Sequence, residues 1–357
     1  MRKINIFIIL VVVLLLIAFY NKKNQEQNFS TNGKIIKNKI SIKAKSQKTK
    51  KEKIIFVPYW ALNTSISDDY DRYVYFGISI NELGVDKNDD GFRQIGQFIK
   101  KTNGKNIDLL IRMIDSRINS RILGNISLQK KIAKDAILIA KENNFNGVVL
   151  DFEISALSFD SVIRQITELL NIFSNESKKK GLKFAITLYG DVYFRLRPYD
   201  VNKIATFCDD VFIMAYDFHK SSGNPGPNFP FGGSEKYGYD FKRMIKSFNS
   251  EVSKEKIVIV FGMFGYDWIV DKKNQSTTSA SPISLNQAKQ KFVDKCLLTN
   301  CIINREDQAS EMQVTYQDKN SNQHIVWFED EVSVKIKENY LINQDILRIG
   351  FWAHSYF

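Results

Sequence analysis

The segment GVVLDFE, residues 147–153, places two carboxylates two positions apart at the end of an apolar run. Because side chains alternate between the two faces of a β-strand, Asp151 and Glu153 are expected to point the same way. Neighbouring carboxylates repel each other's charge, which raises the pKa of one of them and keeps a proton available for a leaving group near neutral pH. Such a pair is suited to cleaving glycosidic bonds. The competing interpretation is an ordinary strand end with solvated acids.

Eight short apolar runs, rich in β-branched residues, follow one another from residue 54 onward. Near-continuous apolar runs are typical of strands buried on both faces, as in a parallel sheet covered by helices. Apolar residues at helical spacing occupy the intervals, for example over 128–140 and 159–173. The pattern predicts an α/β fold, a (β/α)₈ TIM barrel. Its expected strands are 54–60, 73–79, 108–114, 147–153, 183–189, 211–217, 256–262 and 348–354.

Two intervals depart from this alternation. Residues 61–72 are few and polar, so the helix expected there must be reduced or absent. The interval between the seventh and eighth strands is far longer than a crossover needs. Within it, 312–316 and 324–328 flank a turn-rich stretch, which predicts a β-hairpin, and a helix is expected from about 332 to 340. Residues 267–329 are therefore expected to form a small inserted α+β subdomain at the carboxyl ends of the strands.

The first 53 residues differ in composition from the rest. Residues 6–20 are an apolar run that suits either a signal peptide or a membrane anchor. No small-residue cleavage site follows it, which favours an anchor over residues 1–20. Residues 21–53 hold eleven lysines and predict a disordered tether. The chain is expected to be extracytoplasmic and membrane-anchored, or secreted if the N-terminal segment is cleaved.

Charge and cysteine content argue against several classes of protein. Residues 1–53 hold thirteen basic and two acidic side chains, so they carry nearly all of the formal net charge of +12. The remaining 54–357 are nearly neutral, and no nucleic acid is expected as a partner. Three cysteines are no disulfide framework, although Cys296 and Cys301 could close a small loop or, like Cys208, be buried apolar side chains. No metal-binding or nucleotide-binding motif is present, so no cofactor is expected.

Catalytic side chains in such barrels lie at the carboxyl ends of the strands, and the motifs expected there are specific. The fourth run ends in DFE, the sixth in MAYD (214–217), and the eighth contains Trp352. In these motifs the chain resembles glycoside hydrolase family 18, the chitinases and related N-acetylglucosaminidases. Their signature DxxDxDxE matches residues 146–153 at its last two acids, and their MxYD matches MAYD. The resemblance covers essentially all of residues 54–357.

Three further segments resemble the branch of the family that contains spore-cortex peptidoglycan N-acetylglucosaminidases. They are GYDW (265–268), the NPGPNFP loop after MAYD, and the hairpin TYQDKNSNQHIVWFED. Asn146 and Val149 stand where the chitinase signature has its first two aspartates. Members of this branch often lack the middle aspartate, so the resemblance still implies activity. With Val149 behind it, Asp151 is expected to point at Glu153 and the substrate.

The resemblance also implies the role of each site residue. Glu153 would protonate the glycosidic oxygen, while the substrate's own 2-acetamido carbonyl acts as the nucleophile. Asp151 would orient the acetamido group and stabilise the oxazolinium cation that forms when the acetamido oxygen attacks. Tyr216 would donate its hydroxyl to the carbonyl oxygen. No metal or cofactor is required. The residues expected to bind substrate, with packing as the other interpretation for the aromatic residues and the methionine, are Tyr59, Trp60, Met214, Asp217, Tyr266 and Trp352.

Together these features predict a retaining glycosidase that cleaves β-1,4 bonds after N-acetylglucosamine in peptidoglycan or in chitin-like polymers. Its expected partners are an N-acetylglucosamine-containing polysaccharide and, through the N-terminal segment, a membrane; a monomer is expected. The alternative is a non-catalytic, lectin-like barrel that binds the same polymer. The presence of Glu153 argues for turnover. A tethered assembly factor is a third interpretation, which would predict an exposed apolar patch and an empty barrel mouth.

Overall fold

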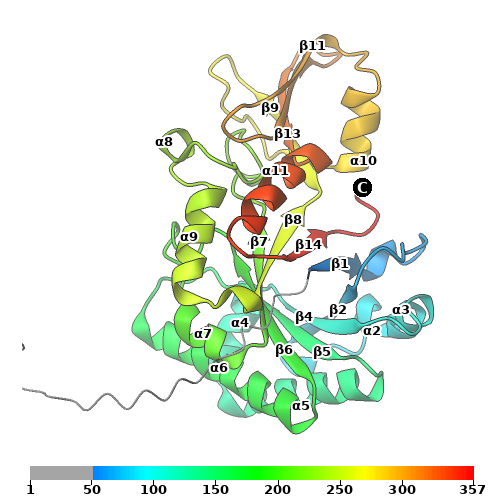
Figure 1. The fold of residues 1–357 in the computed structure, drawn as a ribbon, viewed down its shortest axis with the longest axis vertical. Helices are drawn as coiled ribbons and strands as arrows, with labels where there is room; N and C mark the ends of the chain where they lie inside the picture. The colour runs from blue at the N-terminus through cyan, green and yellow to red at the C-terminus, as the bar shows by residue number, and fades with distance from the viewer. Residues whose placement is uncertain (1–50) are drawn as a thin grey trace, which may run out of the picture. The chain divides into compact units, whose positions relative to one another are not determined.

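A computed structural model describes residues 51–357 as a closed parallel β-barrel with covering helices and an inserted sheet (Figure 1). Eight parallel strands form the barrel, and pairing between the first and second strands closes it. The predicted TIM barrel is therefore confirmed. In order around the barrel the strands are β1 (Glu52–Pro58), β2 (Arg72–Asn81), β4 (Ile107–Met113), β5 (Gly147–Phe152), β6 (Lys183–Tyr189), β7 (Asp210–Ala215), β8 (Ile257–Gly262) and β14 (Arg348–Trp352).

The predicted anchor, residues 1–20, and the predicted tether up to residue 50 lie outside the described residues. Between residues 51 and 357 no helix has both the length and the apolar character needed to cross a bilayer.

Helices connect most of the strands, and several of them begin at polar capping residues. The side chain of Asn125, for example, accepts a hydrogen bond from the backbone of Leu128 at the start of its helix. The interval 61–72 contains no α-helix, as predicted, and only the 3-10 turn η1 (Tyr59–Ala61) precedes it. The longer helices are α3 (Ile95–Lys101), α4 (Ser116–Leu123), α5 (Ile126–Glu142), α6 (Asp160–Lys179), α7 (Val201–Phe207), α9 (Phe241–Glu251) and α11 (Glu331–Ile342). Shorter elements are β3 (Gly84–Val85), α2 (Asp90–Arg93), α8 (Ser234–Tyr237) and η2 (Lys254–Lys256).

The core has two layers because the side chains of each strand alternate. On β5, Val148 and Leu150 pack outward beneath the helices, while Val149 packs inside the barrel with Phe56 and Phe212. The inner cluster is entirely apolar at this level, so the position of the missing middle aspartate is filled by a packed side chain. Asp151 and Glu153, on the inner face of the same chain segment, continue toward the open end of the barrel.

The inserted subdomain is an antiparallel sheet in the order β10-β9-β13-β12-β11. The predicted hairpin is confirmed as β12 and β13, and the predicted helix after it as α11. A disulfide joins Cys296 to Cys301, whereas Cys208 is free and buried. Figure 1 shows this sheet beyond the carboxyl end of β8. Its elements are β9 (Phe264–Val270), β10 (Ser281–Ser284), α10 (Leu285–Ala288), the π-helix η3 (Lys289–Val293), β11 (Thr299–Arg305), β12 (Met312–Gln317) and β13 (Gln323–Phe328).

A buried cluster of charged side chains closes the barrel at the amino ends of its strands. Arg72 donates hydrogen bonds to Asp108 and to Asp210, both at 2.5 Å. Arg348 donates to the other oxygen of Asp210 at 2.6 Å and to Glu52 at 2.7 Å. Burial alone would raise the pKa of Asp210, but the hydrogen bonds and charges of the two arginines outweigh it and lower this pKa to about 2. The bond to Glu52 accounts for a first strand that begins two residues before the apolar run.

Candidate active site

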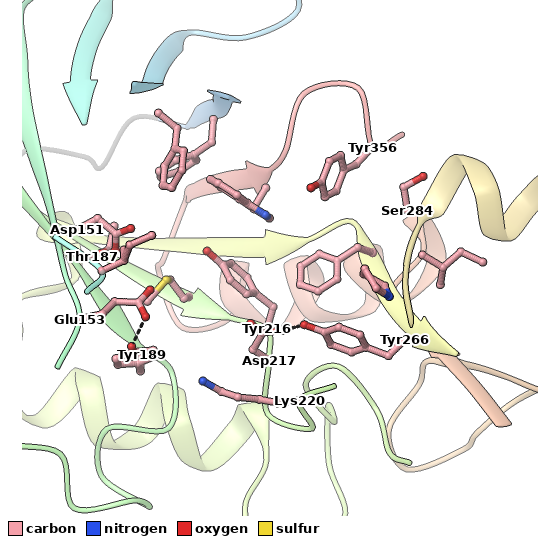
Figure 2. A pocket seen from close by; sticks show the side chains of 18 of the residues that line it. Asp151, Glu153, Thr187, Tyr189, Tyr216, Asp217, Lys220, Tyr266, Ser284 and Tyr356 are labelled. Atoms are coloured by element: carbon pink, nitrogen blue, oxygen red, sulfur yellow. Dashed lines mark hydrogen bonds between the residues drawn. The ribbon is translucent and has the colours of Figure 1, made fainter. Parts of the chain in front are cut away.

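The carboxyl ends of the barrel strands surround a cavity of about 820 Å³ (Figure 2). Strands β9 and β10 of the inserted sheet contribute further wall residues. Tyr59 and Trp60, two of the nine site residues named from the sequence, are not among the residues that line it. The other seven line the cavity together: Asp151, Glu153, Met214, Tyr216, Asp217, Tyr266 and Trp352.

Asp151, near the end of β5, is only 5% exposed. Its carboxylate accepts a hydrogen bond from the hydroxyl of Thr187 on β6 at 2.5 Å. Burial raises the pKa of Asp151 to about 7, and the charge of Glu153 adds to this, while Thr187 and the positive charge of Arg112 oppose it. With Val149 at the position of the missing aspartate, Asp151 is expected to point at Glu153 and the substrate, and one of its oxygens is held by Thr187.

Glu153 follows β5 directly, and its side chain is held by a tyrosine that the sequence analysis does not name. The hydroxyl of Tyr189, at the end of β6, donates to Glu153 Oε2. Burial and the charge of Glu153 together raise the pKa of Tyr189 far above its usual value. The guanidinium of Arg197 lies 3.5 Å from the centre of the Tyr189 ring and is itself bonded to Asp191. Asn119 Nδ2 donates to the carbonyl of Glu153 at 2.6 Å, which fixes the backbone.

Tyr216, directly after β7, lies between β7 and β8. Gly262 at the end of β8 makes room for it, because a Cβ at Gly262 would lie 2.6 Å from the Cβ of Tyr216. The ring meets Phe264 edge to face, with centroids 5.8 Å apart. Burial and the neighbouring carboxylates raise the pKa of Tyr216 well above its usual value. Its hydroxyl makes no hydrogen bond within residues 51–357, so it remains available to a substrate.

Trp352 packs on the aromatic floor of the cavity. Its ring lies 4.6 Å from Phe76 and 6.0 Å from Phe56, measured between centroids. Trp60 is 45% exposed and meets Trp352 from outside the cavity lining, at 6.4 Å. Tyr59 packs against Trp60 and beneath the guanidinium of Arg112, which donates to Asp89 and to a backbone carbonyl. These two residues therefore extend the aromatic surface beside the cavity.

Asp217 is positioned by its backbone and by two neighbours. It has a left-handed backbone conformation with φ of 57°, and its backbone N–H donates to Asn228 Oδ1 at 2.8 Å. The hydroxyl of Tyr266 donates to Asp217 Oδ1 at 2.7 Å. Burial raises the pKa of Asp217, whereas the hydrogen bond from Tyr266 and the charge of Lys220 oppose this. The loop after β7 is thus tied to β9.

A second buried charge cluster anchors that loop. Glu311, which is fully buried, accepts from the backbone N–H of Asn228 at 2.6 Å and of Phe229 at 2.8 Å. Lys337 of α11 donates to Glu311 at 3.0 Å and to both oxygens of Glu329, at 2.9 and 2.6 Å. Burial raises the pKa of Glu329 to about 8, despite Lys337. Hydrogen bonds therefore run from α11 through the insertion to the loop that holds Asp217.

The site residues missed by the sequence analysis are Thr187, Tyr189, Arg112 and Lys220. Thr187 and Tyr189 occupy alternate positions on β6, in the same way as Asp151 on β5 and Glu153 directly after it, and the two strands pair in parallel. The same period of two, applied to KFAITLY, would have found them. Within residues 51–357 no group of three metal-ligating His, Cys, Asp or Glu side chains occurs. Chemically, the cavity offers a carboxyl pair, a free tyrosine hydroxyl and an aromatic floor.

Comparison with known proteins identifies the family. Residues 15–356 match the model of Glycosyl hydrolases family 18, and the chain therefore belongs to this family. This confirms the resemblance stated from the motifs and, at the level of the family, the prediction of a glycosidase.

Relatives include enzymes named for spore cortex. The chain is 25% identical over 247 residues to the cortical fragment-lytic enzyme of Bacillus anthracis, covering 66% of this chain and 52% of that one. It is 23% identical over 235 residues to the di-N-acetylchitobiase of Mus musculus, covering 60% and 62%. The fold matches the spore cortex-lytic enzyme of Bacillus cereus with a TM-score of 0.68 and 19% identity, covering 86% and 71%. The chain spans between about half and two thirds of the length of its curated relatives.

Proposed function

We propose that this protein hydrolyses β-1,4 bonds after N-acetylglucosamine by substrate-assisted catalysis. The observation that carries the proposal is the grouping of Asp151, Glu153 and Tyr216 in one cavity. The two carboxyls interact electrostatically, and the tyrosine hydroxyl has no partner in the described part of the chain. This set supplies a proton donor, a carboxylate for a developing cation and a hydrogen-bond donor for a carbonyl oxygen.

The reaction follows from these positions. Glu153 gives its proton to the glycosidic oxygen, and the bond from C1 to that oxygen breaks as the acetamido oxygen of the same sugar attacks C1. Tyr216 donates to the attacking oxygen, and the carboxylate of Asp151 stabilises the oxazolinium cation. Trp352 stacks against the sugar ring. Water then attacks C1 and loses a proton to Glu153 as the bond from C1 to the acetamido oxygen breaks, and the two successive inversions retain the configuration at C1.

Peptidoglycan glycan strands are the substrate that we propose, with chitin-like polymers as the alternative. Relatives named for cortical fragments support peptidoglycan, and the relative named a chitobiase supports the alternative. The apolar N-terminal run supports a location outside the cytoplasm, held at a membrane by residues 1–20. A lysine-rich tether would keep the barrel near the cell's own wall.

The test is to digest native glycan strands, de-N-acetylated strands and chitin with the purified protein and to identify the new reducing ends by mass. Substrate assistance requires the N-acetyl group, so native strands should yield ends at N-acetylglucosamine and de-N-acetylated strands should resist cleavage. Reducing ends at N-acetylmuramic acid, or equal cleavage of de-N-acetylated strands, would refute the proposal. Cleavage of chitin but not of native glycan strands would instead support chitin-like polymers as the substrate.

A further inference from the structure

Among the described residues that line the active-site cavity, Lys220 is the only basic side chain, and it makes no ion pair within residues 51–357. No carboxylate oxygen of residues 51–357 lies within the 4.0 Å of an ion pair from its ammonium nitrogen. The arginines near the cavity differ in this respect. Arg112 is bonded to Asp89, and Arg197 is bonded to Asp191. A partly buried ammonium that faces a binding cavity without a counterion is an available site for an anion.

The ammonium group lies on the side of the cavity where the proposed acid works. Its nitrogen is 5.3 Å from the centre of the Tyr189 ring, and the hydroxyl of Tyr189 donates to Glu153. Figure 2 shows the amino end of Lys220 directed toward this side. Its charge also opposes the rise in the pKa of Asp217, so it acts within the cavity. A substrate group near Lys220 would therefore belong to the sugar next to the bond that Glu153 protonates.

We propose that Lys220 determines specificity by binding a carboxylate carried by the sugar on the leaving-group side of the cleaved bond. In peptidoglycan this sugar carries a lactyl ether, which presents a carboxylate directly in peptide-free strands and through the stem peptide in intact strands. Chitin carries neither group. The inference rests on the proposed function, because Glu153 as the acid defines the leaving-group side. An anion paired with Lys220 gains a charge-assisted hydrogen bond, whereas a neutral sugar leaves the ammonium solvated.

The experiment compares kcat/KM on peptide-free strands with kcat/KM on the same strands after their carboxyls are amidated. The wild type should prefer the acidic strands about tenfold, and Lys220→Met should lose this preference. Lys220→Arg, which keeps the charge, should retain most of it. Lys246→Met, which removes an exposed lysine of α9, is the matched control and should behave as the wild type. In intact strands the lactyl carboxyl is blocked by the peptide. An effect of Lys220→Met that persists on intact strands therefore assigns the carboxylate to the stem peptide, and an effect seen only on peptide-free strands assigns it to the lactyl group.

An unchanged preference in Lys220→Met, or an equal loss on acidic and amidated strands, would overturn the inference. Failure of the proposed function is distinguished by measuring strand binding in the Glu153→Gln background, where turnover is removed. There, adding Lys220→Met should weaken binding of acidic strands about tenfold and leave binding of amidated strands within about twofold. This result would sustain the role of Lys220 even if the wild type cleaved neither strand. Equal binding of acidic strands with and without Lys220 would overturn it.

Discussion

The two ends of the barrel both carry buried carboxyl groups, yet the groups behave in opposite ways. Asp210 at the amino end and Asp151 at the carboxyl end are each 5% exposed. Two guanidinium groups, those of Arg72 and Arg348, bond to Asp210 and lower its pKa to about 2. Asp151 accepts a hydrogen bond only from a hydroxyl and lies beside the carboxyl of Glu153, and its pKa rises to about 7.

The exposed fraction of the two residues is the same, and the opposite directions of their pKa shifts follow from their different partners. Two arginines keep Asp210 ionised, whereas burial beside the charge of Glu153 favours the protonated form of Asp151, so the pair of Asp151 and Glu153 holds a proton near neutral pH. In the Glu311 cluster the ammonium of Lys337 lies against the carboxyls of both Glu311 and Glu329, yet burial still raises the pKa of Glu329 to about 8. We therefore propose that the arginine-paired Asp210 serves the scaffold and that Asp151 and Glu153 serve the chemistry.

The largest effect on stability is expected at the amino end. Arg72→Met leaves Asp108 and Asp210 buried with one guanidinium fewer, so the free energy of unfolding should fall by about 3–5 kcal/mol. Chemical denaturation measures this change. Arg93→Met is the control, because Arg93 pairs with Asp90 on the surface, and it should cost less than about 1 kcal/mol. An equal loss of unfolding free energy in Arg72→Met and Arg93→Met would show that the buried pairs of Arg72 stabilise the fold no more than a surface pair does.

At the carboxyl end, the corresponding substitution should affect catalysis instead. Asp151→Asn keeps the shape and can still accept the hydrogen bond from Thr187, but it removes the charge that stabilises the cation. We expect kcat to fall about 10²-fold, with a folded protein of unchanged secondary structure by circular dichroism. Wild-type turnover in this variant would show that Asp151 has no catalytic role.

The Glu311 cluster lies between these cases and sharpens the rule. Glu311→Gln places an amide donor against one of the two backbone N–H groups, those of Asn228 and Phe229, that Glu311 accepts from, and it takes one carboxylate from Lys337. The free energy of unfolding should therefore fall by about 1–3 kcal/mol. Turnover per folded molecule should fall far less than in Asp151→Asn, because the loop remains held by Asn228 and Tyr266. A loss of turnover as large as that of Asp151→Asn would show that Glu311 contributes to catalysis as well as to stability.

The smallest expected effect is the pH dependence of stability. The folded pKa of Asp151 is raised to about 7 from about 3.9 in the unfolded chain, so its contribution to stability is complete below pH 4 and is lost as pH rises through 7. Asp151→Asn lacks this loss. Its Tm relative to wild type should therefore increase by roughly a few degrees between pH 5 and pH 8.5. A constant difference in Tm across this range would mean that Asp151 titrates normally.

The sequence predicts those parts of the molecule that depend on local pattern. The alternation along GVVLDFE places Asp151 and Glu153 on the inner face, and the apolar runs predict all eight barrel strands. The hairpin and the strand-end residues Tyr216 and Trp352 follow from the same kind of reasoning. These features need only the period of a strand and the rule that barrel chemistry lies at carboxyl ends.

Contacts between distant segments could not be predicted in this way. Thr187 and Tyr189 contact the acids only because β5 and β6 pair in a particular register. Glu311 meets the backbone of Asn228 across 83 residues of chain, and no local pattern specifies that meeting. Tyr59 and Trp60, which follow β1, lie beside the cavity and not among the residues that line it, and their predicted contact with substrate stays a prediction. A strand end fixes the level of a side chain but not the direction of the turn that follows.

The most direct test of the account is Glu153→Gln, with turnover of glycan strands and thermal unfolding measured on the same preparation. The substitution removes the transferable proton and the charge next to Asp151 but preserves an acceptor for Tyr189. We expect kcat to fall at least about 10²-fold while Tm stays equal to or above that of the wild type. Unchanged turnover in this variant would contradict the assignment of Glu153 to the chemistry. So would a fall in Tm as large as that expected when a buried ion pair is broken.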